Sequence, residues 1–166
     1  MILAHVYIMM RRYDAATAEA EKAVEMEPGS ADPHATLGHV LLLSGRPQEA
    51  ITRLENAMRL NPFPPSSYYH NLGSAYSVAG RDEEAIPFYK KALEQEPNNQ
   101  IALSGLIVSY SLADRLEEAR GLVKELLRIN PEYCVKRGKG FIKDQAVARR
   151  RKSAARKAGL PDCPIR

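Results

Sequence analysis

A period of about 34 residues runs through this sequence and constrains its fold more than any other feature. Prolines recur with spacings of 34, 35 and 34 residues, at Pro28, Pro62, Pro97 and Pro131. A leucine slot and an alanine slot keep the same register, at Leu3, Leu37, Leu72 and Leu106 and at Ala16, Ala50, Ala85 and Ala119. Several slots that recur together over four copies indicate a repeat array, with an ordinary helical bundle of accidental periodicity as the alternative.

The third copy, from Tyr68 to Pro97, shows the slots most fully. It contains, in order, Leu72, Gly73, Tyr76, Gly80, Ala85, Tyr89, Ala92 and Pro97. This order resembles the tetratricopeptide repeat (TPR), in which each unit is a pair of antiparallel helices. The resemblance implies an all-α fold: a TPR solenoid of about four helix-turn-helix repeats in a right-handed superhelix, with a C-terminal helix. Small residues fit where paired helices cross, and prolines end each pair.

The repeats occupy residues 1–131, and a tail follows them. We expect a truncated first repeat over 1–30 and further repeats over 31–64, 65–99 and 100–131. The net charge changes at the boundary, from −4 in residues 1–131 to +8 in residues 132–166. The tail is therefore basic, and Asp144 is expected to cap a helix over about 144–158 that stops at Gly159. Asp82 is expected to cap the second helix of the third repeat in the same way.

Composition and motifs argue against several function classes. No run of about 18 apolar residues occurs, so we expect no membrane span. Cys134 and Cys163 lie far apart and outside the repeats. They predict neither a disulfide framework nor a zinc site, and a cytoplasmic protein is the default. The histidines lack the spacings of a metal site, and no phosphate-binding loop or catalytic motif is present. We therefore expect no enzyme activity, no cofactor and no metal.

In the TPR family the first helix of each repeat lines a concave groove that holds peptides. By register, the groove residues here are His5, Met9, Thr36, His39, Leu43, His70, Asn71, Ser74, Ser77 and Val108. Family members that grip acidic chaperone C-termini place Lys and Arg on this face, whereas this chain places none there. The resemblance implies a protein-interaction scaffold that binds a neutral peptide or helix, with Asn71 holding the peptide backbone. A face that packs a missing neighbour is the alternative.

Two further segments narrow the resemblance. The linker Asn61–Tyr69 and the tail stretches Asn130–Tyr133 and Arg156–Asp162 resemble the C-terminal repeat regions of bacterial adenylate/guanylate cyclase-type signalling proteins. The alternative function is therefore a regulatory or oligomerisation segment of such a protein. Because Met1 falls inside the first repeat, we favour a fragment of a longer chain, whose apolar first helix is available for self-association.

The tail carries a run of four basic residues, Arg149–Lys152. Such a run could contact phosphate, but no aromatic residues are interleaved for stacking on bases. We therefore expect a solvated helix face and no nucleic-acid partner. Alanines and cations stand where leucines would strengthen the docking of this helix, so we expect it to pack weakly on the repeats.

Overall fold

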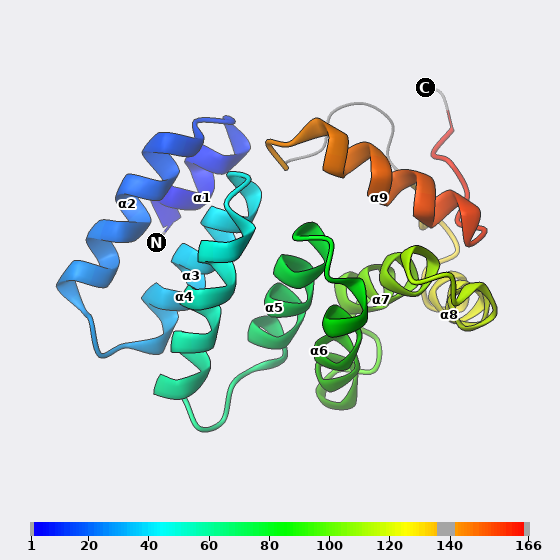
Figure 1. The fold of residues 1–166 in the computed structure, drawn as a ribbon, viewed down its shortest axis with the longest axis horizontal. Helices are drawn as coiled ribbons and strands as arrows, with labels where there is room; N and C mark the ends of the chain where they lie inside the picture. Colours follow the sequence, from blue (N-terminus) through cyan, green and yellow to red (C-terminus); the bar gives the residue numbers. More distant parts are fainter. Residues whose placement is uncertain (1, 136–141, 165–166) are drawn as a thin grey trace.

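A computed structural model describes residues 2–135 and 142–164 of the 166-residue chain. Regular structure in these residues is helical, apart from an isolated bridge between Val135 and Asp162. Eight of the described helices form four antiparallel pairs, and a further helix lies across them (Figure 1). The bounds are α1 Ile2–Met9, α2 Tyr13–Met26, α3 Ala31–Leu43, α4 Pro47–Leu60, α5 Ser66–Val78, α6 Asp82–Gln95, α7 Gln100–Leu112, α8 Leu116–Ile129 and α9 Gln145–Lys157. The expected all-α TPR fold is confirmed. None of the described helices is long and apolar enough to cross a membrane.

Small residues set the distance between paired helices. The alanines that recur in each repeat have no exposed surface: Ala16, Ala50, Ala85 and Ala119. A Cβ added at Gly38 would lie 2.6 Å from Cγ of Leu54, and one added at Gly73 would lie 3.1 Å from the ring of Tyr89. Leu54 and Tyr89 are themselves fully buried. Each large side chain therefore fills the space that a small residue on the paired helix leaves open.

The turn inside each pair contains one residue in the left-handed conformation. The four φ values are 57° at Arg11, 81° at Gly45, 82° at Gly80 and 57° at Asp114. Glycine adopts this conformation without a Cβ penalty, and aspartate tolerates it better than most residues. The loss of glycine from the fourth turn therefore leaves the turn geometry intact.

An arginine precedes the second helix of every pair, at Arg12, Arg46, Arg81 and Arg115. In the third repeat the Arg81 guanidinium lies 4.5 Å from the centroid of the Tyr76 ring and donates two hydrogen bonds to Glu84, at 2.6 and 2.5 Å. Arg115 lies equally close to Tyr110 and pairs with Glu118. These pairs are exposed, so each adds little stability, and they recur at the start of the second helix.

Helix α9 runs across the row of turns that join the paired helices, from the second repeat to the fourth (Figure 1). Just before it, the backbone N–H of Lys143 donates to the carbonyl of Leu43 at 2.8 Å, and at its end Lys157 donates to Asp114 at 3.0 Å. Asp144 caps the helix as expected, because its carboxylate accepts from the N–H groups of Ala146 and Val147 at 2.8 and 3.2 Å.

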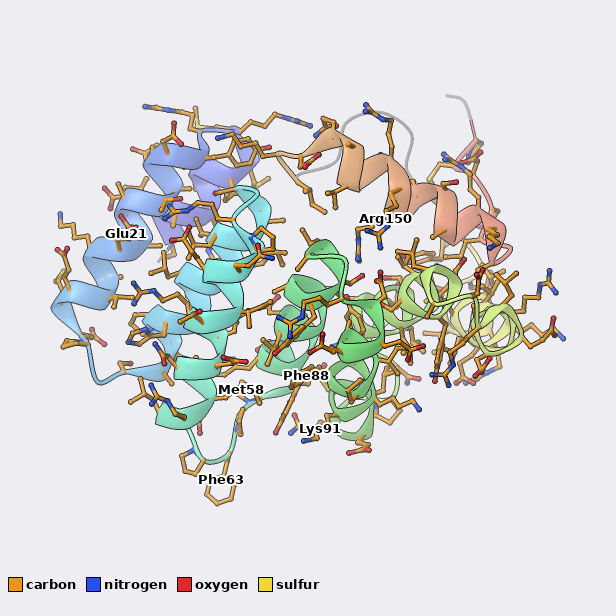
Figure 2. All side chains as sticks on the ribbon, in the orientation of Figure 1. Glu21, Met58, Phe63, Phe88, Lys91 and Arg150 are labelled. Atoms are coloured by element: carbon orange, nitrogen blue, oxygen red, sulfur yellow. A yellow bond between two sulfur atoms is a disulfide. The ribbon has the colours of Figure 1, made fainter. Side chains whose placement is uncertain are left out.

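Alanines form the docking face of α9. Ala148, Ala154, Ala155 and Ala158 are all buried. Arg150 points from α9 toward the repeats (Figure 2) and binds the carboxylate of Asp82 at 2.5 Å. The expectation that Asp82 caps α6 is wrong, since Arg81 takes the cap position and Asp82 is instead buried among polar partners. The basic face is partly solvated, as expected for Arg149 and Arg150, but Arg150 and Arg151 also bind Asp82 and Ser77 of the repeats, which was not expected.

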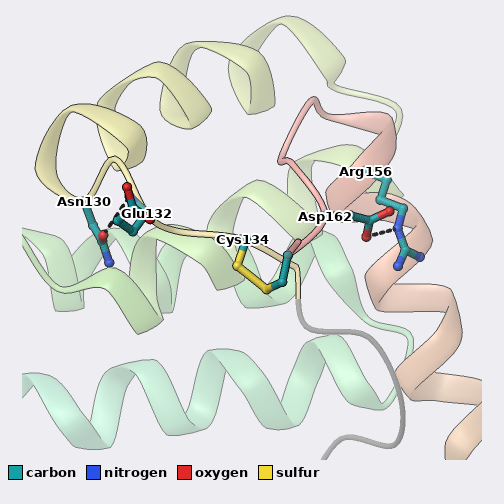
Figure 3. The surroundings of a disulfide bond; sticks show 6 residues. Asn130, Glu132, Cys134, Arg156 and Asp162 are labelled. Atoms are coloured by element: carbon teal, nitrogen blue, oxygen red, sulfur yellow. Dashed lines mark hydrogen bonds and ion pairs between the residues drawn. A yellow bond between two sulfur atoms is a disulfide. The ribbon is translucent and has the colours of Figure 1, made fainter. Parts of the chain in front are cut away.

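The two cysteines form a disulfide, contrary to the expectation from their spacing. Cys134 and Cys163 are bonded, with 4.9 Å between their Cα atoms, and the bond joins the segment after α8 to the segment after α9 (Figure 3). Beside it, the N–H of Val135 donates to the carbonyl of Pro161 at 2.7 Å. Sequence separation misled us because α9 folds back and brings the two ends of the tail together.

Candidate peptide-binding cleft

The first helices α1, α3, α5 and α7 contact one another in sequence and form one face of the array, here called the inner face. The predicted groove residues on it differ in exposure. His5 and Met9 are exposed, and Ser77 and Val108 are buried. The six others are half-buried: Thr36, His39, Leu43, His70, Asn71 and Ser74.

Three histidines from successive repeats lie near one another on the inner face. The rings of His5 and His39 have centroids 5.7 Å apart and are tilted by 39°. The pKa of His39 is lowered to about 4, chiefly by burial and to a smaller extent by the electrostatic effect of His5 and His70. Burial also lowers the pKa of His70, against the opposing effect of Glu96. No group of three or more His, Cys, Asp or Glu residues that could hold a metal ion occurs within the described part of the chain.

Asn71 and Ser74 lie next to this cluster on α5. The hydroxyl of Ser74 is 3.0 Å from the phenolic oxygen of Tyr89, which reaches between α5 and α7. The amide of Asn71 is half-buried and makes no side-chain hydrogen bond with another described residue. Its donors and acceptor therefore remain available to a ligand.

A cleft of about 520 Å³ opens between the inner face and the tail. Helices α5 and α7 supply one wall, with Ser74, Gln100, Ile101, Ser104, Gly105 and Val108. The segment after α8 and the α9 region supply the other, with Asn130, Glu132, Tyr133, Cys134, Val135, Arg151, Lys152, Ala155 and Leu160. Figure 3 shows the disulfide within this second wall. The volume lies in the range of sites that hold small ligands or a few residues of a peptide.

The tail covers one predicted groove residue, Ser77, and another, Val108, lines the cleft beside it. Ser77 is 1% exposed, donates to Asp82 at 2.5 Å and accepts a hydrogen bond from Arg151 of α9. Its hydroxyl is therefore unavailable to a peptide while α9 is docked. Val108 is 7% exposed and contributes to the lining of the cleft.

Cations also reach the cleft, although the first helices carry none. Arg151 and Lys152 come from α9, and Glu132 stands in the same lining. Sequence reasoning placed the groove on first helices alone and therefore missed the whole tail wall. Two signals could have revealed it: the alanines at helical spacing on α9, and the pair of cysteines that flank this helix.

A second apolar depression of about 550 Å³ lies between α6 and α8. Leu93, Leu106, Tyr110 and Leu122 line it, with Lys90, Glu94 and Glu118 also present. Amide groups are absent from this set of described residues, so it offers less to the backbone of a peptide than the cleft beside α9 does.

Comparisons with known proteins agree with the fold. The small glutamine-rich tetratricopeptide repeat-containing protein 2 of Mycosarcoma maydis is 30% identical over 97 residues, which are 58% of this chain and 27% of that protein. The chain thus spans about a quarter of that relative. The crystal structure of MamA superposes with a TM-score of 0.70 at 19% identity, over 95% of this chain and 93% of that chain. YrrB, described as a TPR protein with an unusual peptide-binding site, superposes with a TM-score of 0.64 at 20% identity, over 78% of this chain and 66% of that chain.

Because both sequence identities are low, the two superpositions establish the fold and nothing more. Family membership rests on the sequence itself: residues 4–75 and 79–135 match the family model for the tetratricopeptide repeat. The matched residues make up most of the chain and reach all four helix pairs, apart from the first residues of α1 and the last residues of α5. This chain therefore belongs to the tetratricopeptide repeat family.

Proposed function

We propose that the chain is a protein-interaction scaffold that binds a short peptide along its inner face, with one end of the peptide in the cleft beside α9. The cleft carries the proposal, because its volume of about 520 Å³ is lined in part by Ser74. Asn71, which is also half-buried, precedes Ser74 by one turn on the same helix. The peptide-binding site attributed to YrrB supports the proposal through the shared fold alone.

The lining of the cleft suggests the chemistry of the peptide. Ile101, Val108 and Leu160 offer apolar surface for a side chain, whereas Gln100, Asn130 and Ser104 offer amides and a hydroxyl for the peptide backbone. Arg151 and Lys152 add two positive charges and Glu132 one negative charge, so the lining carries a small net positive charge. We therefore propose a peptide of low net charge with an apolar anchor residue, and a binding rather than a catalytic role.

A random dodecapeptide display library tests this proposal. Peptides retained by the wild type should bind Asn71→Ala more weakly by about 1 kcal/mol, or roughly five-fold, because a net hydrogen bond to the peptide backbone is lost. Asn98→Ala is the matched control, since Asn98 is exposed on the loop before α7, outside both the inner-face helices and the cleft lining. Fluorescence anisotropy of a labelled selected peptide measures both. Equal affinities for wild type and Asn71→Ala would remove Asn71 from the site.

The division into repeats over residues 1–131 and a tail over 132–166 is also proposed. In support of this division, α9 contacts the inner-face helix α7 while α1–α8 pair with one another. The cyclase-type role has no support from the matches described above. A cytoplasmic location remains a prediction, and a closed disulfide is more typical of an oxidising compartment.

Self-association through α1 is a second proposal, with a specific observation behind it. Ile2 is 84% exposed and Met9 72% on this helix, and Met10 directly after it is 60% exposed. Apolar surface of this kind favours association. Ile2→Glu should shift any dimer toward monomer in light scattering, whereas an unchanged mass distribution would contradict a role for α1.

A further inference from the structure

The disulfide occupies a place where its redox state can affect ligand binding. Cys134 belongs to the lining of the cleft. Its partner Cys163 lies in the segment that follows α9 and that also contains Leu160. Both cysteines are partly exposed, so an external thiol can reach the bond. A covalent link between residues 134 and 163 therefore holds the wall of the cleft that faces α7 (Figure 3).

Non-covalent contacts alone hold this wall weakly. The docking face of α9 consists of alanines, which bury little apolar area each, and Leu160 is the largest buried side chain nearby. The ion pairs of Lys157 with Asp114 and of Arg156 with Asp162 are largely exposed and screened by solvent. Helix α9 has only 13 residues, a length at which an isolated helix is marginal in water. The remaining contacts include Arg150 with Asp82, Arg151 with Ser77 and two backbone hydrogen bonds, from Val135 to Pro161 and from Cys163 to Val135.

We propose that the Cys134–Cys163 bond is a redox latch for the peptide cleft: reduction by a dithiol releases the tail from α7 and weakens peptide binding. This regulation rests on the proposed function, since it concerns the same cleft. Without the tail wall, the inner face of α7 offers an open surface and no enclosed volume. A ligand that loses one wall of its site loses a corresponding part of its buried contact area.

The chemistry of release balances with a dithiol as the co-reactant. One thiolate of the reductant attacks a sulfur of the Cys134–Cys163 bond and forms a mixed disulfide, and the other cysteine leaves as a thiolate and takes up a proton. The second thiol of the reductant then displaces the remaining cysteine. Two electrons and two protons pass to the protein, and the reductant ends as a disulfide.

Release also changes the polar contacts at the turn of the third repeat. While α9 is docked, Arg150 binds the carboxylate of Asp82 and Arg151 donates to Ser77. After release, Asp82 keeps the hydrogen bond from Ser77 but loses its cation. Ser77 becomes accessible at the edge of the inner face, so reduction replaces a two-walled cleft with a longer and shallower surface.

Hydrogen–deuterium exchange of the whole chain tests the latch without a ligand. Exchange is measured for the oxidised wild type, for the wild type reduced with dithiothreitol, and for the variant Cys134→Ser/Cys163→Ser. Free thiols are counted in each wild-type sample. We expect two free thiols after reduction and at least ten-fold faster exchange in α9 and in residues 132–135, with α3 and α4 unchanged. Unchanged exchange in α9 once two thiols are free would overturn the proposal. A bond that dithiothreitol cannot reduce while the repeats stay folded would also overturn it.

A binding arm separates the latch from the proposed function. The dodecapeptide library is passed over the oxidised wild type, and the retained pool is then measured on the reduced protein and on the double serine variant. We expect the reduced wild type and the double serine variant to bind the peptides at least ten-fold more weakly than the oxidised wild type does. A released tail with unchanged binding would refute the role of the wall. If the oxidised protein retains no peptide, the proposed function fails, and the predicted loss of binding on reduction fails with it. Hydrogen–deuterium exchange still decides whether reduction releases the tail.

Discussion

Gly105 on α7 packs directly against the ring of Tyr89 on α6. A Cβ added at Gly105 would lie 2.4 Å from Cε1 and Cζ of that ring, closer than real side-chain contacts allow. Tyr89 is fully buried and also touches the position of Gly73 on α5. One tyrosine thus joins the third and fourth repeats, and its hydroxyl ends beside Ser74 on the inner face.

The first prediction follows from this contact. Gly105→Ala should lower the free energy of unfolding by about 1–3 kcal/mol, because the ring cannot move without disturbing two helix interfaces. Gly121→Ala is the matched control in a helix, where a Cβ meets nothing within 4 Å. It should raise stability by up to about 1 kcal/mol through helix propensity. Urea unfolding measures both, and equal effects of the two substitutions would contradict the packing described.

The second prediction concerns the buried carboxylate of Asp82. Arg150→Ala should destabilise the chain by about 1–2 kcal/mol, because Asp82 is only 7% exposed and loses its cation. The estimate is at the low end for a buried pair, since the Arg150 side chain is 44% exposed. Arg149→Ala, an exposed neighbour on α9, should change stability by less than about 0.5 kcal/mol. Thermal unfolding measures both variants. A larger loss of stability for Arg149→Ala than for Arg150→Ala would contradict this docking geometry.

The third prediction is a pH dependence that arises at His39. The folded chain lowers the pKa of His39 from 6.5 to about 4, chiefly by burial, so folding favours the neutral imidazole. The unfolded state therefore binds more protons than the folded state between these values, and stability is full above about pH 6.5 and falls as the pH drops toward 4. The loss attributable to His39 is at most about 3 kcal/mol.

His39→Gln isolates that contribution, since carboxylates titrate in the same range. Between pH 7 and pH 4 the wild type should lose more stability than His39→Gln in chemical denaturation. Parallel pH profiles for the two proteins would show that His39 is not held neutral by the fold.

Much of the repeat array could be predicted because its determinants are local and periodic. The prolines, the small residues at helix crossings and the residues with positive φ recur in one register, so each copy confirms the others. Asp114 shows why even a deviating copy could be interpreted: aspartate takes the left-handed turn position that glycine holds at Gly45 and Gly80. The inner-face positions followed from the same register, although the register did not indicate which of them would be covered.

The tail could not be predicted as well, because its contacts are neither periodic nor close in sequence. Arg150 meets Asp82 across 68 positions, and Arg151 meets Ser77 across 74. The alanines on α9 predicted a weak docking face, but they did not reveal where the helix docks, which is close to the turns of the repeats. The same fold-back pairs Cys134 with Cys163, which a count of cysteines cannot reveal.

The central claim, that a peptide binds between the inner face and the tail, is tested most directly by nuclear magnetic resonance. The isotope-labelled, oxidised chain is titrated with a peptide selected from the dodecapeptide library, and backbone amide shifts are mapped onto the structure. We predict that the largest shifts cluster at Asn71, Ser74, Ser104 and the tail residues Tyr133 and Val135, with little change at Leu93 and Leu122 between α6 and α8. Shifts concentrated at Leu93 and Leu122 instead, with the cleft residues unaffected, would contradict the account.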